Sequence, residues 1–190
     1  MFQDVRRVVA VAVAVVGVAS LAGVAPGRAA EIRNVGERTF PFAPGGEVLI
    51  ESQNGRIVVE AWDRQQIRVQ ITRTVRAGDQ ARAKELMKGL RADVELRPGR
   101  LLIESRYPRV RENLGIWDIL GGRVAALQVH YYLQVPRNTS FTLQTSNGEV
   151  RVRGTRGDVK AVTVNGDLEF SGVTGSLEIQ TTNGEVRLTG

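Results

Sequence analysis

The chain has 190 residues, a formal net charge of +6 and no cysteine. Without cysteine it can form no disulfide, hold no metal through thiolates and accept no lipid on a thiol. Its 26 basic and 20 acidic residues are interspersed rather than gathered in blocks, so the charge does not indicate a nucleic-acid-binding protein.

The first 29 residues differ in composition from the rest. Arg6 and Arg7 precede a run of small apolar residues from Val8 to Val24, and further small residues lead to Ala29. This order predicts a secretory signal peptide over residues 1–29, cleaved after Ala29, and therefore export to the periplasm or cell surface. The alternative is a retained membrane anchor, because the apolar run is nearly as long as the roughly 20 residues of a spanning helix. We expect membrane contact only in that case.

The next region, residues 30–139, is predicted to be β-rich. Residues 47–51 and 56–62 consist largely of β-branched and aliphatic residues, and the stretch between them contains Asn54 and Gly55. Asparagine and glycine tolerate the positive φ of tight turns, so these two runs predict a β-hairpin.

One helix is predicted in this region, packed against the sheet. Residues 66–75 alternate apolar and polar with period two, which indicates a half-buried strand. Asp79 is a suitable N-cap for a helix at about 79–90. Apolar residues follow at helical spacing, at Ala83, Leu86, Met87 and Leu90.

A long loop is expected between the later strands. Strands are predicted at 91–95, 100–105 and 127–135, with Pro98-Gly99 as the turn between the first two. Residues 107–123 have no clean period, and loops of that length are uncommon unless they bind something or pack locally. Trp117 in this loop is therefore a candidate binding residue, the alternative being that it packs onto the sheet.

The most informative pattern is a nine-residue repeat in residues 140–190. Glycine recurs every nine residues, followed by a polar and then an aliphatic residue, at Gly148, Gly157, Gly166, Gly175 and Gly184. Asparagine precedes every second glycine, at Asn147, Asn165 and Asn183, which sets a second period of eighteen. Such self-similarity indicates stacked β structure in which each unit buries its apolar face against its neighbours.

These patterns predict an all-β fold, mainly β with one short helix. A β-sheet region with a packed helix would lead into a single-stranded β-solenoid of 9/18-residue repeats at 140–190, continuous with the preceding region. The repeated glycines would form its turns. An antiparallel meander would show the same double period and remains the alternative, although short strands and corners that repeat at eighteen favour the solenoid.

The asparagines of the repeat would lie above one another as a ladder at one corner. We take Asn147, Asn165 and Asn183 as candidate binding residues, with a purely conformational role in turns as the alternative. The last unit would leave an open edge that could pair with a partner or with a second copy of the chain.

The chemistry of catalysis is not visible in the sequence. His130 is the only histidine and falls on the polar face of a predicted strand, and the usual nucleophile, phosphate and zinc motifs are absent. The single glycine of the repeat does not match the calcium-binding nonapeptide, so Ca²⁺ would lack its oxygen ligands. We expect no enzyme, no metal and no cofactor. A glycan-acting β-helix enzyme is a weaker alternative, with Glu149, Asp167 and Glu185 aligned at one corner.

Residues 40–190 resemble a family of exported bacterial proteins known as "putative adhesins", whose domain has no established function. The resemblance is carried by the segments Pro44–Glu51, Asn54–Asp63, Thr145–Val150 and Thr181–Val186, although the C-terminal array is short for the family. It implies a β-solenoid-like fold at the cell envelope and no catalytic residues. We therefore expect a non-enzymatic envelope protein that binds an envelope or surface component or itself. The alternative is a membrane-anchored periplasmic accessory or sensing partner of an envelope system.

Overall fold

A computed structural model describes residues 30–108 and 126–190. The predicted signal peptide and the part of the loop that holds Trp117 lie outside the described residues. Within them the chain is mostly strand, with one helix, and the strands form two mixed sheets. The prediction of a mainly β protein with one short helix is confirmed.

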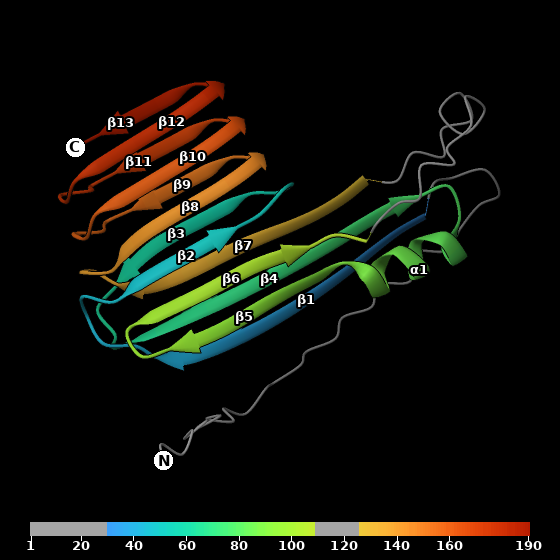
Figure 1. Cartoon of the computed structure of the whole chain (residues 1–190), viewed down its shortest axis with the longest axis horizontal. Helices are drawn as coiled ribbons and strands as arrows, with labels where there is room; N and C mark the ends of the chain where they lie inside the picture. Colours follow the sequence, from blue (N-terminus) through green and yellow to red (C-terminus); the bar gives the residue numbers. More distant parts are fainter. Residues whose placement is uncertain (1–29, 109–125) are drawn as a thin grey trace, which may run out of the picture.

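The two sheets lie face to face (Figure 1). The first sheet has the order β1 (Ala30–Pro41), β4 (Gln66–Ala77), β7 (Ala126–Pro136), β3 (Ile57–Trp62), β9 (Val150–Arg153), β11 (Leu168–Ser171), β13 (Val186–Thr189). The second has the order β12 (Leu177–Asn183), β10 (Val159–Asn165), β8 (Ser140–Asn147), β2 (Glu47–Glu51), β6 (Arg100–Arg106), β5 (Arg91–Arg97).

In the repeat region the chain crosses from one sheet to the other at every strand. We call two successive strands, one in each sheet, a rung: β8–β9, β10–β11 and β12–β13. Residues eighteen apart are Cα partners, so Phe141 pairs with Val159 and Val159 with Leu177. All these pairs are parallel, which is not the pairing of an antiparallel meander.

The predicted hairpin at Asn54-Gly55 is wrong. Strands β2 and β3 belong to different sheets, where β2 pairs with β8 and β3 with β9, both in parallel. They therefore form a further rung, and Asn54-Gly55 is its corner. This rung lies between β6–β7 and β8–β9, although it comes first along the chain. The sheets thus continue without a break from the region before residue 140 into the repeat.

At the other end of the molecule the strands are antiparallel. β4 pairs with β7 and β1 with β4 in one sheet, and β5 pairs with β6 in the other. The turn between β5 and β6 lies at Pro98-Gly99, as predicted, where Gly99 adopts a φ of 69°. The sequence patterns missed strand β1, because its inward-facing positions include the polar Asn34 and Arg38 and so break the apolar alternation.

The helix α1 (Gln80–Gly89) confirms the prediction in position and in its N-cap. The Asp79 carboxylate accepts a hydrogen bond from the Arg82 backbone N–H at 2.8 Å, which satisfies one of the free donors of the first turn. Ala83 and Leu86 are buried, and the helix packs against β1 and β4. It lies beside the antiparallel end, away from the repeat (Figure 1).

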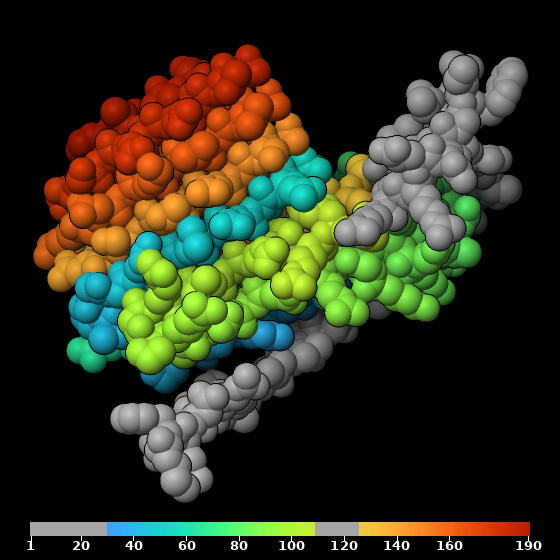
Figure 2. Space-filling view, in the orientation of Figure 1, coloured from blue at the N-terminus to red at the C-terminus, as the bar shows by residue number. Residues whose placement is uncertain are grey.

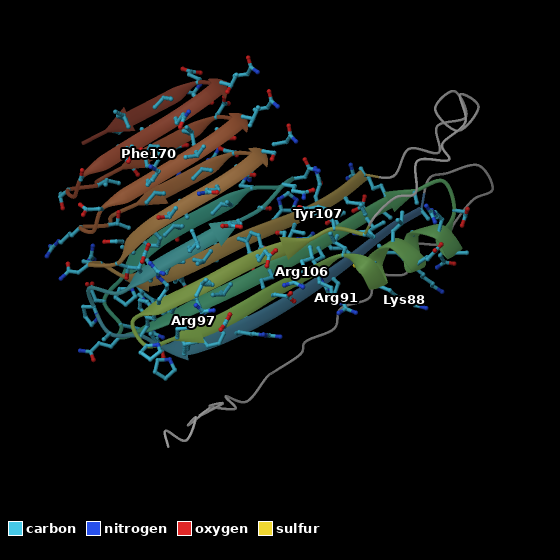
Figure 3. All side chains as sticks on the ribbon, in the orientation of Figure 1. Lys88, Arg91, Arg97, Arg106, Tyr107 and Phe170 are labelled. Carbon is cyan, nitrogen blue, oxygen red and sulfur yellow. The ribbon has the colours of Figure 1, made fainter. Side chains whose placement is uncertain are left out.

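The core lies between the two sheets, and its inward-facing positions follow the same pattern in every rung. In the second sheet, each rung strand points two apolar side chains inward and then a hydroxyl, as in Phe141, Leu143 and Thr145 of β8. In the first sheet, strands such as β9 add two aliphatic residues. Phe170 of β11, labelled in Figure 3, is 2% exposed. In the last rung, Val186 and Leu188 are 39% and 62% exposed, because no further rung covers them in the described part of the chain.

Candidate binding surface

Four asparagines form a ladder along one corner of the rungs. Each side-chain amide N–H donates to the amide oxygen of the previous asparagine at 2.9 Å, linking Asn183 to Asn165, Asn165 to Asn147 and Asn147 to Asn54. Asn147, Asn165 and Asn183 are exposed. The structure thus brings together the three predicted asparagines, and it adds Asn54 to them. We call these four residues the asparagine ladder.

Tyr107 closes the ladder at the Asn54 end. Its hydroxyl donates to the Asn54 carbonyl oxygen at 2.9 Å and accepts from the Asn54 N–H at 3.0 Å. The Tyr107 side chain, which comes from the end of β6 (Figure 3), thus bonds both backbone groups of the first ladder member, and the Asn54 carbonyl oxygen also accepts from the Val129 N–H at 2.9 Å. The sequence offered no signal for this contact, because Tyr107 and Asn54 are 53 residues apart.

The glycines beside the ladder allow its close spacing. A Cβ on Gly148 would fall against the Gly55 carbonyl oxygen, one on Gly166 against Gly148, and one on Gly184 against Gly166, each far inside normal contact distance. Gly157 and Gly175 are packed in the same way at the opposite corner, against Thr139 and Gly157. These positions therefore require glycine chiefly for space. Gly55 and Gly184 also have φ values of 135° and 153°.

A column of charged and polar side chains follows the glycines on the outer surface. The Asp167 carboxylate accepts from the Glu185 backbone N–H at 2.9 Å. One rung further, Glu149 forms ion pairs with Arg56 at 2.7 Å and with Arg151. The corner alignment considered for Glu149, Asp167 and Glu185 is thus present, but each of these carboxylates is engaged, Glu185 by Arg187 at 2.6 Å.

His130 begins this column. Its Nδ1 accepts a hydrogen bond from the Arg56 backbone N–H at 3.0 Å. Nδ1 therefore carries no proton, and the imidazole is neutral. Burial, and then the positive charges of Arg56 and Arg33, lower the pKa of His130. A histidine held neutral in this way supports the strand next to it and does not have that nitrogen available as a general base.

Beside the ladder, a hydroxyl column runs along the inner side of the second sheet. Its members are Ser105, Ser52, Thr145, Thr163 and Thr181. Ser105 hydrogen-bonds to Ser52 at 3.2 Å and to the buried Tyr131 hydroxyl at 2.5 Å. Burial raises the pKa of Tyr131, so this phenol remains protonated. An open hollow of about 310 Å³ lies over this part of the sheet, with Gln53, Gln144 and Ser146 on its rim.

On the outer face of the first sheet, ion pairs link one rung to the next. Arg153 contacts Glu169 at 3.1 Å and Glu60 at 4.0 Å. The Tyr132 hydroxyl donates to Glu60 at 2.6 Å, and this hydrogen bond raises the pKa of Tyr132 to about 12. Exposed pairs of this kind each contribute little to stability, but they hold the outer side chains in one arrangement.

In the parts of the chain that the structure describes, no group of three or more His, Cys, Asp or Glu side chains is placed to hold a metal ion. Over the same residues, no helix has the length and apolar character to cross a membrane.

No protein-family model matches the sequence, and no curated protein matches it. Solved structures with a similar course of the chain include a "putative cell adhesion protein" from Clostridium sporogenes, with 8% identity and a TM-score of 0.43. The similarity covers 82% of this chain and 99% of the other. A "putative adhesin" from Bacteroides fragilis has 11% identity and a TM-score of 0.46, over 80% of this chain and 61% of its own length. These names apply to those proteins, and for this chain adhesion is a proposal.

Proposed function

We propose that this chain is a non-enzymatic exported protein of the cell envelope, whose rigid β surface binds another molecule through the asparagine ladder. In this proposal the rungs form a β-solenoid, and residues 1–29 direct export. The observation that carries the proposal is the ladder itself, an exposed row of amides held in place by hydrogen bonds to one another.

The ladder leaves hydrogen-bonding capacity free on its outer side. An asparagine amide has a second N–H and a second lone pair beyond those used between neighbouring rungs. The amides repeat with the strand spacing of about 4.8 Å. Because they are already ordered, a partner would lose little binding energy in fixing them. Such a row suits an extended partner with regularly spaced polar groups, such as a polysaccharide of the envelope or a cell surface.

The state of the acidic and basic groups supports binding rather than catalysis. A retaining or inverting glycosidase needs two carboxylates, one of them a protonated acid. Here Glu149 is paired with two arginines, and Asp167 accepts a backbone N–H. His130 uses its Nδ1 to hold the Arg56 backbone.

The test is saturable binding of the purified protein to isolated cell envelopes and to immobilised polysaccharides. Asn165→Ala breaks two ladder hydrogen bonds and should weaken binding by about tenfold or more, since hydrogen bonds of this kind contribute about 1 kcal/mol each. Asn138→Ala is the matched control, because Asn138 is exposed in a turn away from the ladder. Background binding of the unsubstituted protein, or equal losses in both variants, would refute the proposal.

Export requires its own measurement. Cell fractionation and the mass of the N-terminus should show a free terminus at Ala30 in the periplasm or medium. A terminus at Met1 in the membrane fraction would instead favour the anchored accessory or sensing partner.

A second candidate function, self-association, is favoured by the exposed rung β12–β13. Each of its strands has a neighbour on one side only, and Leu188 is 62% exposed. Open edges with apolar side chains can pair with another copy. Sedimentation should then show concentration-dependent dimers that Leu188→Lys abolishes and Leu96→Lys, on the distant β5, does not. A monomer at all concentrations would exclude this candidate.

A further inference from the structure

A groove of about 420 Å³ lies at the antiparallel end of the molecule, where the edge of β1 faces the edge of β5. In Figure 2 the blue atoms of β1 appear directly below the lime-green atoms of β5. The groove combines polar and apolar walls, and its lining includes Asn34, Arg38, Ile71, Arg73, Arg91 and Ala92. It is remote from the asparagine ladder and does not depend on the function proposed above.

Arg73 is an unusual residue at the floor of this groove. It occupies an inward-facing position of β4, in the same series as the buried Ile71 and Val75. Its guanidinium donates to the Leu90 carbonyl oxygen at 2.8 Å and to the Asn34 amide oxygen at 2.7 Å. Both acceptors are neutral, and a guanidinium has more N–H donors than these two bonds use.

Two further arginines line the same groove. Arg91 begins β5 directly after the end of α1, and Figure 3 labels it there beside Lys88. Arg38 lies on β1, in the same inward-facing series as Asn34. Among residues 30–108 and 126–190, none of the three groove arginines has a carboxylate within 4.0 Å.

The carboxylates at the rim are committed to other partners. Glu37 pairs with Arg68 at 3.4 Å, and Asp93 pairs with Arg106 at 2.9 Å. The groove therefore has an excess of positive charge that the neighbouring acids do not neutralise. Burial lowers the pKa of Arg73, which reflects the cost of keeping this charge out of water without a counter-ion.

A purely structural role accounts for only part of this arrangement. The two hydrogen bonds of Arg73 tie the end of α1 to β1, as basic residues near helix C-termini often do. That role explains neither the unneutralised charge nor the presence of Arg38 and Arg91 at the same groove, because neither residue forms those bonds.

We propose that this groove is a binding site for a phosphate ester, with Arg73 as the anchor and Arg38 and Arg91 at the rim. Planar guanidinium groups bind phosphate oxygens through paired N–H donors. A phosphate monoester carries close to two negative charges, and so it balances several arginines better than one carboxylate does. The groove is larger than a bare ion, and its apolar residues Ile71 and Ala92 would contact the organic part of the ester.

The experiment is isothermal titration of the purified protein at constant ionic strength with inorganic phosphate and with glycerol 3-phosphate, and sedimentation with phosphatidic acid vesicles. We expect saturable binding of glycerol 3-phosphate. Arg38→Gln with Arg91→Gln should weaken it by about tenfold or more, since hydrogen bonds to charged groups are worth more than neutral ones. These rim variants keep the Arg73 hydrogen bonds, so the fold should be retained.

Arg33→Gln is the matched control for the single rim variant Arg38→Gln, because Arg33 lies on the same strand but on its outer face and its replacement removes the same single charge. It should leave binding unchanged. Vesicle binding in addition to soluble binding would identify a lipid headgroup as a source of the ester. The proposal is overturned if neither soluble phosphate binds saturably up to about 10 mM, if only vesicles bind, or if Arg33→Gln weakens binding as much as Arg38→Gln does.

Discussion

Replacing Gly148 by alanine should separate two rungs of the structure. The added Cβ would meet the Gly55 carbonyl oxygen, and next the Gly55 carbonyl carbon at 2.7 Å and nitrogen at 3.2 Å. All three atoms belong to the backbone, so no side chain can turn aside to make room. Since carbon and oxygen normally stay about 3.3 Å apart, the two corners must move apart by more than about 1 Å.

The magnitude follows from the hydrogen bonds across this contact. Asn147 N–H donates to the Gln53 carbonyl at 2.7 Å, and the N–H groups of Gly55 and Ile57 donate to Asn147 and Glu149 at 2.9 Å. Each of these three hydrogen bonds contributes about 1 kcal/mol, so losing or stretching them should lower the free energy of unfolding by about 3 kcal/mol. This value lies within the range for overpacked interiors.

Urea unfolding followed by far-UV circular dichroism measures this loss. With a slope of about 2 kcal/mol/M, the midpoint should fall by about 1.5 M. Gly36→Ala is the control: nothing lies within 4 Å of its Cβ position, so the change should be neutral or stabilise by up to about 1 kcal/mol. An unchanged midpoint for Gly148→Ala, or equal losses at both sites, would refute the reasoning.

Three further outcomes are expected. The folded pKa of His130 is lowered, so protonation favours the unfolded state and stability should fall as the pH drops below the unfolded value of about 6.5; His130→Gln should remove this dependence in urea titrations between pH 7 and 5. Tyr107→Phe removes the two hydrogen bonds between Tyr107 and Asn54; the Asn54 carbonyl keeps its bond from the Val129 N–H, but the Asn54 N–H loses its partner, which should cost about 1–3 kcal/mol and be seen as faster amide exchange at Asn54. Phe170→Ala should cost about 3–5 kcal/mol in thermal unfolding, while Leu188→Ala, at an exposed position, should cost much less; equal losses would contradict the burial described for these two residues.

The parts of the fold that the sequence predicts are those with a local or periodic cause. The sequence predicts the helix at about 79–90, and α1 is found at Gln80–Gly89, because its N-cap and apolar spacing lie within about three turns of chain. The ladder of Asn147, Asn165 and Asn183 was expected because equal spacing places equal residues at equal corners. The binding role of Trp117 stays a prediction.

The errors arise where one local signal serves two structures. Asn54-Gly55 suits a hairpin turn and a rung corner equally well, since both reverse the chain between two β runs. Which of the two structures forms depends on the residue that Asn54 contacts, and here that residue is Asn147, 93 residues later in the sequence. The groove with Arg73 could not be predicted for a similar reason. The edges of β1 and β5 are brought together by pairings between distant segments, and no short sequence pattern encodes those pairings.

The position of the β2–β3 rung has a consequence for how the chain acquires its structure. Both neighbours of this rung, β6–β7 and β8–β9, come later in the sequence. As the polypeptide emerges N-terminus first, neither edge of β2 or β3 can be covered until β6 (Arg100–Arg106) has followed, and the last free edge waits until β9 (Val150–Arg153) has followed. Folding therefore cannot advance rung by rung from the N-terminus, and unpaired edges held open for this time are sites where nascent chains can associate wrongly.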